Sequence, residues 1–145
     1  MIVDEASNAE APCTPGGSPP ERSAHMLTEN EAQAFAHAWI EAWNSHNLEA
    51  IMSYYAPEVV LVSPTAAKIL NCSSGVVEGT KALRAYFARG LERYPNLTFE
   101  LKDVLAGISN ILVYYVSEAG IRTGEFMEFG SHGKIIRVAA TKSHL

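Results

Sequence analysis

The segment WIEAWNSHNLEAIMSYYAPEVVLVSP, Trp39–Pro64, contains the signals that decide the fold. Two tryptophans four residues apart lie on one face of a helix. Asn47 then offers an N-cap to a second, short helix that we expect to continue to Pro57. The apolar and mostly β-branched residues 59–62 predict a buried strand, which Ser63-Pro64 ends. The segment therefore predicts a helix, a short helix and a strand, in that order.

The chain before this segment divides into a tail and a helix start. Residues 1–26 are rich in proline, glycine and serine and carry almost no large apolar side chains. Such a segment buries too little surface to offset its ordering entropy, so we expect a disordered tail and a folded domain over 27–145. Thr28 and Glu31 form a capping box, and the apolar i, i+3, i+4 spacing after it predicts a helix to about Ser45.

The chain after this segment predicts one more helix and a run of strands. We expect residues 65–75 to be irregular, 76–77 to form a short strand, and a helix to run from Gly79-Thr80 to Pro95. Residues 97–102 alternate between apolar and polar, as a half-buried strand does. Three further strand-like segments follow, separated by short turns that favour antiparallel hairpins: 111–116, 121–129 and 134–141. Helices first and a strand meander last predict an α+β fold, with helices covering one face of a curved sheet.

Composition excludes several classes of protein. The 145 residues suit one domain, and 48% apolar and 19% charged residues are ordinary for a globular protein. The net charge is −5 and the sequence contains no basic stripe, so we expect no nucleic-acid partner. There is no apolar run long enough for a membrane span and no signal-peptide pattern, so we expect no membrane partner and a cytoplasmic protein. Neither the cysteines nor the histidines show a metal spacing, and no cofactor motif is present, so we expect neither a metal nor a cofactor.

Glu125 is the clearest chemical signal, because alternation along 121–129 places it with apolar residues. A tight turn through Gly130–Gly133 would pair it with Val138, and a turn at 118–120 would pair it with Val113. A carboxylate on the covered face of a sheet must find a donor or take a raised pKa. It could then act as an acid or a base. The alternative is a purely structural carboxylate that lies near the open rim of the curved sheet or pairs with Tyr115, Trp39 or Arg84.

Several motifs together resemble the nuclear-transport-factor-2-like superfamily and, within it, the SnoaL-like domains. The resemblance covers roughly Leu27–Thr141 and rests on W-x3-WNSHNL-x2-I, YAPEVVLVSP, VEGTKALRAYF and EFMEFGSHGKI. It implies a cone-shaped antiparallel sheet wrapped around helices, with a pocket in the wide end. It also implies a homodimer, which we place on the outer sheet face at Phe126 and Ile135. The superfamily includes isomerases, hydrolases, polyketide cyclases, dehydratases and non-catalytic binding modules.

The steroid-isomerase branch of this superfamily matches only in part. Its general base corresponds to Ser63, which cannot replace a carboxylate. Its oxyanion-binding tyrosine corresponds to Trp39, whose indole donates only one weaker hydrogen bond. Its late-strand carboxyl corresponds to Glu125. We therefore do not expect steroid isomerisation by that mechanism, whereas SnoaL-like cyclase chemistry is compatible. The epoxide-hydrolase branch needs a carboxylate–arginine–carboxylate cluster. Glu125 and Arg84 are candidates for two of its members, but the sequence does not indicate which residue would be the second carboxylate.

We predict Glu125 as the acid or base of a cofactor-independent isomerase, cyclase or hydrolase acting on a small hydrophobic metabolite. The alternative is a non-catalytic ligand-binding or dimerisation module. Aromatic walls with few polar groups suit a hydrophobic molecule. The predicted ligand-binding residues are Trp39, Tyr55, Ser63, Phe87, Tyr115, Met127 and Val138.

Overall fold

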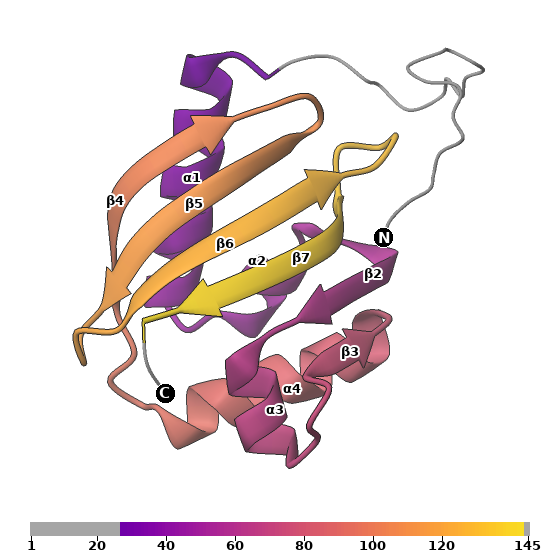
Figure 1. Ribbon diagram of the computed structural model, residues 1–145, viewed down its shortest axis with the longest axis vertical. Coiled ribbons are helices and arrows are strands. Elements are labelled where there is room, and N and C mark those ends of the chain that lie inside the picture. Colours follow the sequence, from indigo (N-terminus) through magenta and orange to yellow (C-terminus); the bar gives the residue numbers. More distant parts are fainter. Residues whose placement is uncertain (1–26, 144–145) are drawn as a thin grey trace, which may run out of the picture.

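A computed structural model describes residues 27–143 (Figure 1). The predicted disordered tail, 1–26, lies outside the described residues. The elements follow in the order α1 Glu29–Asn44, α2 Leu48–Met52, β2 Tyr55–Val62, α3 Pro64–Leu70, β3 Val76–Glu78, α4 Thr80–Arg93, β4 Phe99–Ala106, β5 Asn110–Ser117, β6 Arg122–Phe129 and β7 Ile135–Lys142.

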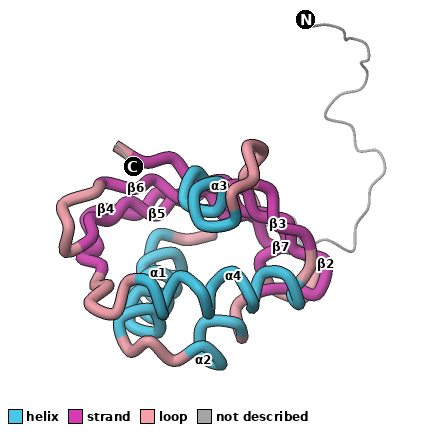
Figure 2. Tube along the Cα trace, turned by 90° about the horizontal axis from the view of Figure 1, so that it is seen from below, coloured by secondary structure: helices cyan, strands magenta, loops and turns pink. Residues whose placement is uncertain are grey.

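The predicted α+β architecture is confirmed. The strands form one six-stranded sheet in the order β3-β2-β7-β6-β5-β4. The sheet is curved and unclosed, and α1, α2 and α4 lie inside its curve while α3 lies across one end (Figure 2). Strands β4 to β7 form the expected antiparallel meander, and β2 joins it by a parallel pairing with β7.

The first helix begins where the capping box predicts. The Thr28 hydroxyl accepts from the Glu31 backbone N–H at 3.0 Å, and the Glu31 carboxylate accepts from the Thr28 N–H at 2.9 Å. Two of the four free N–H groups at a helix start are thereby satisfied. Asn47 caps α2 in the same way, accepting from the Ala50 N–H at 3.1 Å.

Two predictions for the segments on either side of β2 are wrong. The short helix ends at Met52, and Pro57 lies inside β2 rather than stopping a helix. The proline is tolerated because the β2–β7 register shifts between Tyr55 and Val60, where a missing N–H is harmless. Residues 64–70 are helical rather than irregular, because Ser63 caps α3 through the Thr65 N–H at 3.1 Å and Pro64 occupies its first turn.

The register of the last hairpin also differs from the prediction. Glu125 pairs with Ala140 rather than Val138, because the turn is longer than expected and a bulge lies between Glu128 and Phe129. The shift is two residues, so the inward face of β6 is unchanged. The same bulge turns Ile135 inward, where it is fully buried. The expectation that Ile135 lies on the outer face is therefore wrong. The predicted pairing of Glu125 with Val113 is confirmed.

Candidate active site

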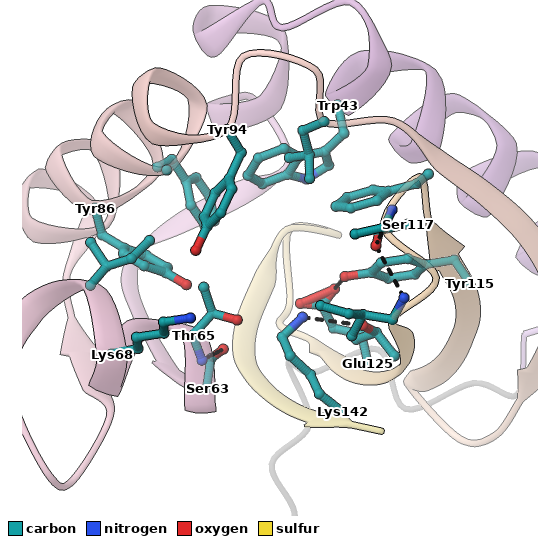
Figure 3. Close-up of a pocket in the computed structure, with 18 of the residues that line it drawn as sticks. Trp43, Ser63, Thr65, Lys68, Tyr86, Tyr94, Tyr115, Ser117, Glu125 and Lys142 are labelled. Atoms are coloured by element: carbon teal, nitrogen blue, oxygen red, sulfur yellow. Dashed lines mark hydrogen bonds between the residues drawn. The ribbon is translucent and has the colours of Figure 1, made fainter. Parts of the chain in front are cut away.

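A cavity of about 220 Å³ opens at the end of the sheet where β6 begins and β7 ends, beneath α3 and α4 (Figure 3). This volume is below the range of about 300–1,000 Å³ that is typical of drug-sized ligands. Its contents would therefore be small. The cavity is bounded by an aromatic wall and by two groups of polar side chains.

The aromatic wall is a continuous set of ring contacts. Phe99 packs on Tyr115 with ring centroids 4.2 Å apart and stacks on Trp39 at 6.3 Å. Trp43 meets Phe87 edge to face at 4.8 Å. Stacked and edge-to-face arrangements are favourable for aromatic pairs, so these contacts stabilise the apolar wall.

Glu125 is the first polar feature of the cavity. Its side chain comes from the middle of β6, is 9% exposed, and accepts a 3.0 Å hydrogen bond at Oε1 from the Tyr115 hydroxyl. Burial raises the pKa of Glu125, while the charge of Lys142 and the Tyr115 hydrogen bond oppose that rise. The carboxyl group is thus closer to neutrality than a solvated glutamate, which suits an acid or a base.

Lys142 lies beside this carboxyl group at the end of β7. Its ammonium donates to the Thr123 hydroxyl at 3.1 Å, across a register pair that joins the two residues. Burial lowers the pKa of Lys142, and the negative charge of Glu125 opposes that fall. The two charges interact without forming a direct ion pair. Both side chains line the cavity (Figure 3).

The second polar group lies across the cavity. Ser63 and Thr65 come from the junction of β2 with α3, Lys68 from α3, Tyr86 from α4, and Tyr94 from the residue that follows α4. Burial raises the pKa of Tyr86, so its hydroxyl remains protonated. We call Thr65, Lys68, Tyr86 and Tyr94 the donor end, because each side chain carries an O–H or N–H group.

Five of the predicted site residues line this cavity: Trp39, Ser63, Phe87, Tyr115 and Glu125. Tyr55, Met127 and Val138 do not, although we placed them on the pocket wall. Met127 and Val138 do face inward, but they lie deeper along their strands, within the packed core. The Tyr55 hydroxyl lies behind the wall and accepts from the Trp39 indole at 3.1 Å.

Lys142, Thr123 and the donor end were missing from the predicted site. Lys142 shares the inward face of β7 with Val138 and Ala140, so strand parity alone could have found it. The wrong register hid its pairing with Thr123. Lys68 could not be found, because its helix was predicted as irregular chain.

A model of the SnoaL-like domain matches residues 36–140. The chain belongs to the SnoaL-like family. A SnoaL-like protein of unknown function from Burkholderia thailandensis is 32% identical, with a TM-score of 0.79 over 83% of this chain and 100% of that one.

More distant structures share the fold of this SnoaL-like domain. A protein from Kribbella flavida, provisionally described as a ketosteroid isomerase, is 17% identical with a TM-score of 0.61 over 79% of this chain and 78% of that one. A protein from Sinorhizobium meliloti, provisionally described as a polyketide cyclase, is 12% identical with a TM-score of 0.63 over 79% of this chain and 100% of that one. A search of curated proteins gave no match.

Two further features concern metal binding and membrane crossing. Residues 27–143 contain no group of histidine, cysteine, aspartate and glutamate side chains that could hold a metal ion. Within that same range, none of the helices has the length and apolar character needed to cross a membrane.

Proposed function

We propose that this SnoaL-like protein is a cofactor-independent enzyme that moves a proton on a small hydrophobic carbonyl compound, with Glu125 as the acid and base. The observation that carries the proposal is the buried Glu125 carboxyl group, held by Tyr115 and facing an apolar cavity beside Lys142. Isomerisation and cyclisation are the reaction classes that this arrangement supports best.

The proposed reaction begins with ionised Glu125 removing a proton from the carbon next to a substrate carbonyl. Its raised pKa makes it a stronger base than a solvated glutamate. Negative charge then develops on the carbonyl oxygen. Lys142 has three N–H groups and uses one of them for Thr123, so the others can stabilise that oxygen.

The proton on Glu125 then returns to the substrate. If the substrate has a C=C bond conjugated with the enolate, delivery to the far carbon of that bond gives an isomer with the double bond moved. Alternatively, the carbanion attacks a second carbonyl of the same molecule and Glu125 protonates the resulting alkoxide, which closes a ring. Both routes leave Glu125 in its starting state and need no other reactant.

Proton exchange tests the proposal without knowledge of the natural substrate. The probe is 2-tetralone in D₂O, whose acidic α-protons exchange with solvent and are followed by NMR. We expect the protein to accelerate this exchange and Glu125→Gln to lower the rate about 10²-fold or more, the usual contribution of a general base.

The matched control is Glu128→Gln, which changes a carboxylate on the same strand but on the outer face. It should leave the exchange rate unchanged. An equal loss in both variants, or exchange by the parent no faster than in buffer, would contradict proton transfer by Glu125.

The alternative function is a non-catalytic ligand-binding module, and one observation favours it. Trp39 occupies the position that the resemblance gives to an oxyanion donor, but its indole N–H is engaged by Tyr55. A binding module would be stabilised by hydrophobic ligands in a thermal-shift assay, equally in the parent and in Glu125→Gln, with no exchange of α-protons.

We also propose a homodimer through the outer face of the sheet. Leu112 and Phe126 are register partners on that face and are half-buried, although none of the described elements covers them. Glu128 and Arg137 lie beside them as an ion pair within the chain, so a twofold axis near them would bring each charge close to its opposite in the second copy. Light scattering should give twice the 15.7 kDa chain mass, and Phe126→Glu should give the single mass.

A further inference from the structure

The cavity has two different polar ends, and only one of them is needed for proton transfer. Glu125 and Lys142 form the end on the sheet. The donor end, Thr65, Lys68, Tyr86 and Tyr94, lies on α3, on α4 and just after α4, on the other side of the cavity (Figure 3). A ligand that fills the cavity therefore meets both.

The donor end has no negative charge of its own. The two carboxylates that line the cavity are Glu118 and Glu125. Glu118 accepts the Thr98 backbone N–H at 2.9 Å, and Glu125 accepts the Tyr115 hydroxyl. Lys68 forms no ion pair with any residue of 27–143. Its positive charge is therefore available to a ligand in the cavity.

The neighbours of Lys68 are suited to an anionic oxygen. Tyr86 is 7% exposed and keeps its proton, because its pKa is raised by burial. The hydroxyls of Thr65 and Tyr94 supply further O–H donors. A carboxylate accepts several such hydrogen bonds, and bonds to a charged acceptor are the stronger kind.

The opposite end is less suited to an anion, although it also has a lysine. Glu125 lies beside Lys142, and the opposite charges of these two groups partly offset each other. When Glu125 is ionised as a base, it repels a second carboxylate. The charge pattern therefore orients an anionic ligand with its acidic group toward Lys68.

We propose that the donor end binds the carboxylate of an aromatic or otherwise apolar carboxylic acid, whose body lies along the aromatic wall between Lys68 and Glu125. The natural substrate would then be a keto acid, with its carbonyl oxygen at Lys142 and the adjacent C–H bond at Glu125. This assignment of the substrate class rests on the proposed function, whereas carboxylate binding at Lys68 does not.

Binding of a matched pair of probes tests the inference. The probes are 2-naphthylacetate and its neutral amide, 2-naphthylacetamide, followed by quenching of the fluorescence of Trp39 and Trp43. We expect the parent to bind the acid about fivefold or more tightly than the amide, as a hydrogen-bonded charge at a partly exposed site allows.

Lys68→Gln should remove this preference, because it should weaken binding of the acid and leave binding of the amide unchanged. The control is Lys81→Gln, which removes an exposed lysine of α4 that does not line the cavity. It should change neither affinity. Lys68→Arg, which keeps the charge, should retain the preference.

Three outcomes would overturn the inference. One is a parent that binds both probes equally or binds neither. Another is a Lys68→Gln variant that keeps the full preference. The third is a preference lost in Lys142→Gln instead, because the acid would then bind at the sheet end. Glu125→Gln separates the two proposals: it should abolish proton exchange and keep the preference for the acid.

Discussion

The two halves of β6 present inward side chains of opposite character at nearly the same depth. Thr123 and Glu125, in the first half, are 1% and 9% exposed, and Met127, in the second half, is 0% exposed. The first half borders the cavity with Tyr115 and Lys142. The second half packs into the core with Phe129, whose ring meets Phe35 edge to face at 5.1 Å.

This difference shows that partners, rather than depth, decide where the strand can carry polar groups. Glu125 has a hydroxyl donor at 3.0 Å and Thr123 has an ammonium donor at 3.1 Å. Buried polar groups are stable when such partners exist and costly when they do not. Met127 has apolar register neighbours on both sides, Ile111 and Val138.

The largest expected effect comes from moving the carboxylate to the wrong half. Met127→Glu should cost about 4 kcal/mol or more of unfolding free energy, because it buries a charge without a donor. Urea unfolding measures this loss. Lowering the pH should restore part of the stability, since a protonated glutamate carries no charge.

The reverse exchange is the control. Glu125→Met should remain folded, because the aromatic wall and the core around it are apolar. Equal losses in Met127→Glu and Glu125→Met would mean that the two halves do not differ in the way the partners indicate.

The next effect separates Lys142 from other lysines. Lys142→Met should lower kcat/KM for the exchanged ketone about 10²-fold, the scale of one oxyanion donor. It should also raise the pKa of Glu125, because Lys142 is the cation that holds it down. The acidic limb of the pH–rate profile should therefore move to higher pH.

Lys102→Met is the matched control for this variant. Lys102 pairs with Glu100 at 3.4 Å on β4 and does not line the cavity, so its loss should leave the profile in place. An unshifted profile in Lys142→Met would mean that Lys142 does not act on Glu125.

Strand parity explains how much of this site the sequence could predict. Inward and outward residues alternate with a period of two, so the inward position of Glu125 survived an error of two residues in the register. Its pairing with Val113 was predictable because the β5–β6 turn is short. The capping box and Asn47 fixed the helix starts by local hydrogen bonds alone.

The missed features depend on interactions between distant segments. The bulge after Glu128 has no clear local signal, and it decides both the Thr123–Lys142 pairing and the burial of Ile135. Pro57 is an ordinary helix stop in isolation, yet it lies in a strand because β7 pairs around it. The start of helix α3 is ambiguous in the sequence. Ser63-Pro64 is a good N-terminal pair for a helix, but the same two residues also end a strand.

A smaller effect concerns stability against pH in the polar half. The pKa of Glu125 is raised in the folded protein above its ordinary value of 4.5. Well below pH 4.5, Glu125 is protonated in both the folded and the unfolded protein, so it does not change the unfolding free energy. As the pH rises toward the folded pKa, only the unfolded state ionises, so the folded parent loses stability.

Glu125→Gln cannot ionise and escapes this loss. Its unfolding free energy relative to the parent should therefore increase as the pH rises above 4.5. Thermal unfolding at a series of pH values measures the difference. A constant difference, or one that favours the parent at high pH, would mean that Glu125 is not desolvated.

The smallest effect belongs to the outer face of the same strand. Glu128 pairs with Arg137 at 3.1 Å, with side chains that are 27% and 63% exposed. Surface ion pairs contribute little, so Glu128→Gln should cost less than about 0.5 kcal/mol in dilute protein. If a second copy covers this face, the cost should grow with protein concentration, because unfolding then includes dissociation. Unfolding at two concentrations roughly a hundredfold apart distinguishes the cases. A cost as large as that of Met127→Glu at low concentration would remove the contrast between the two faces of β6.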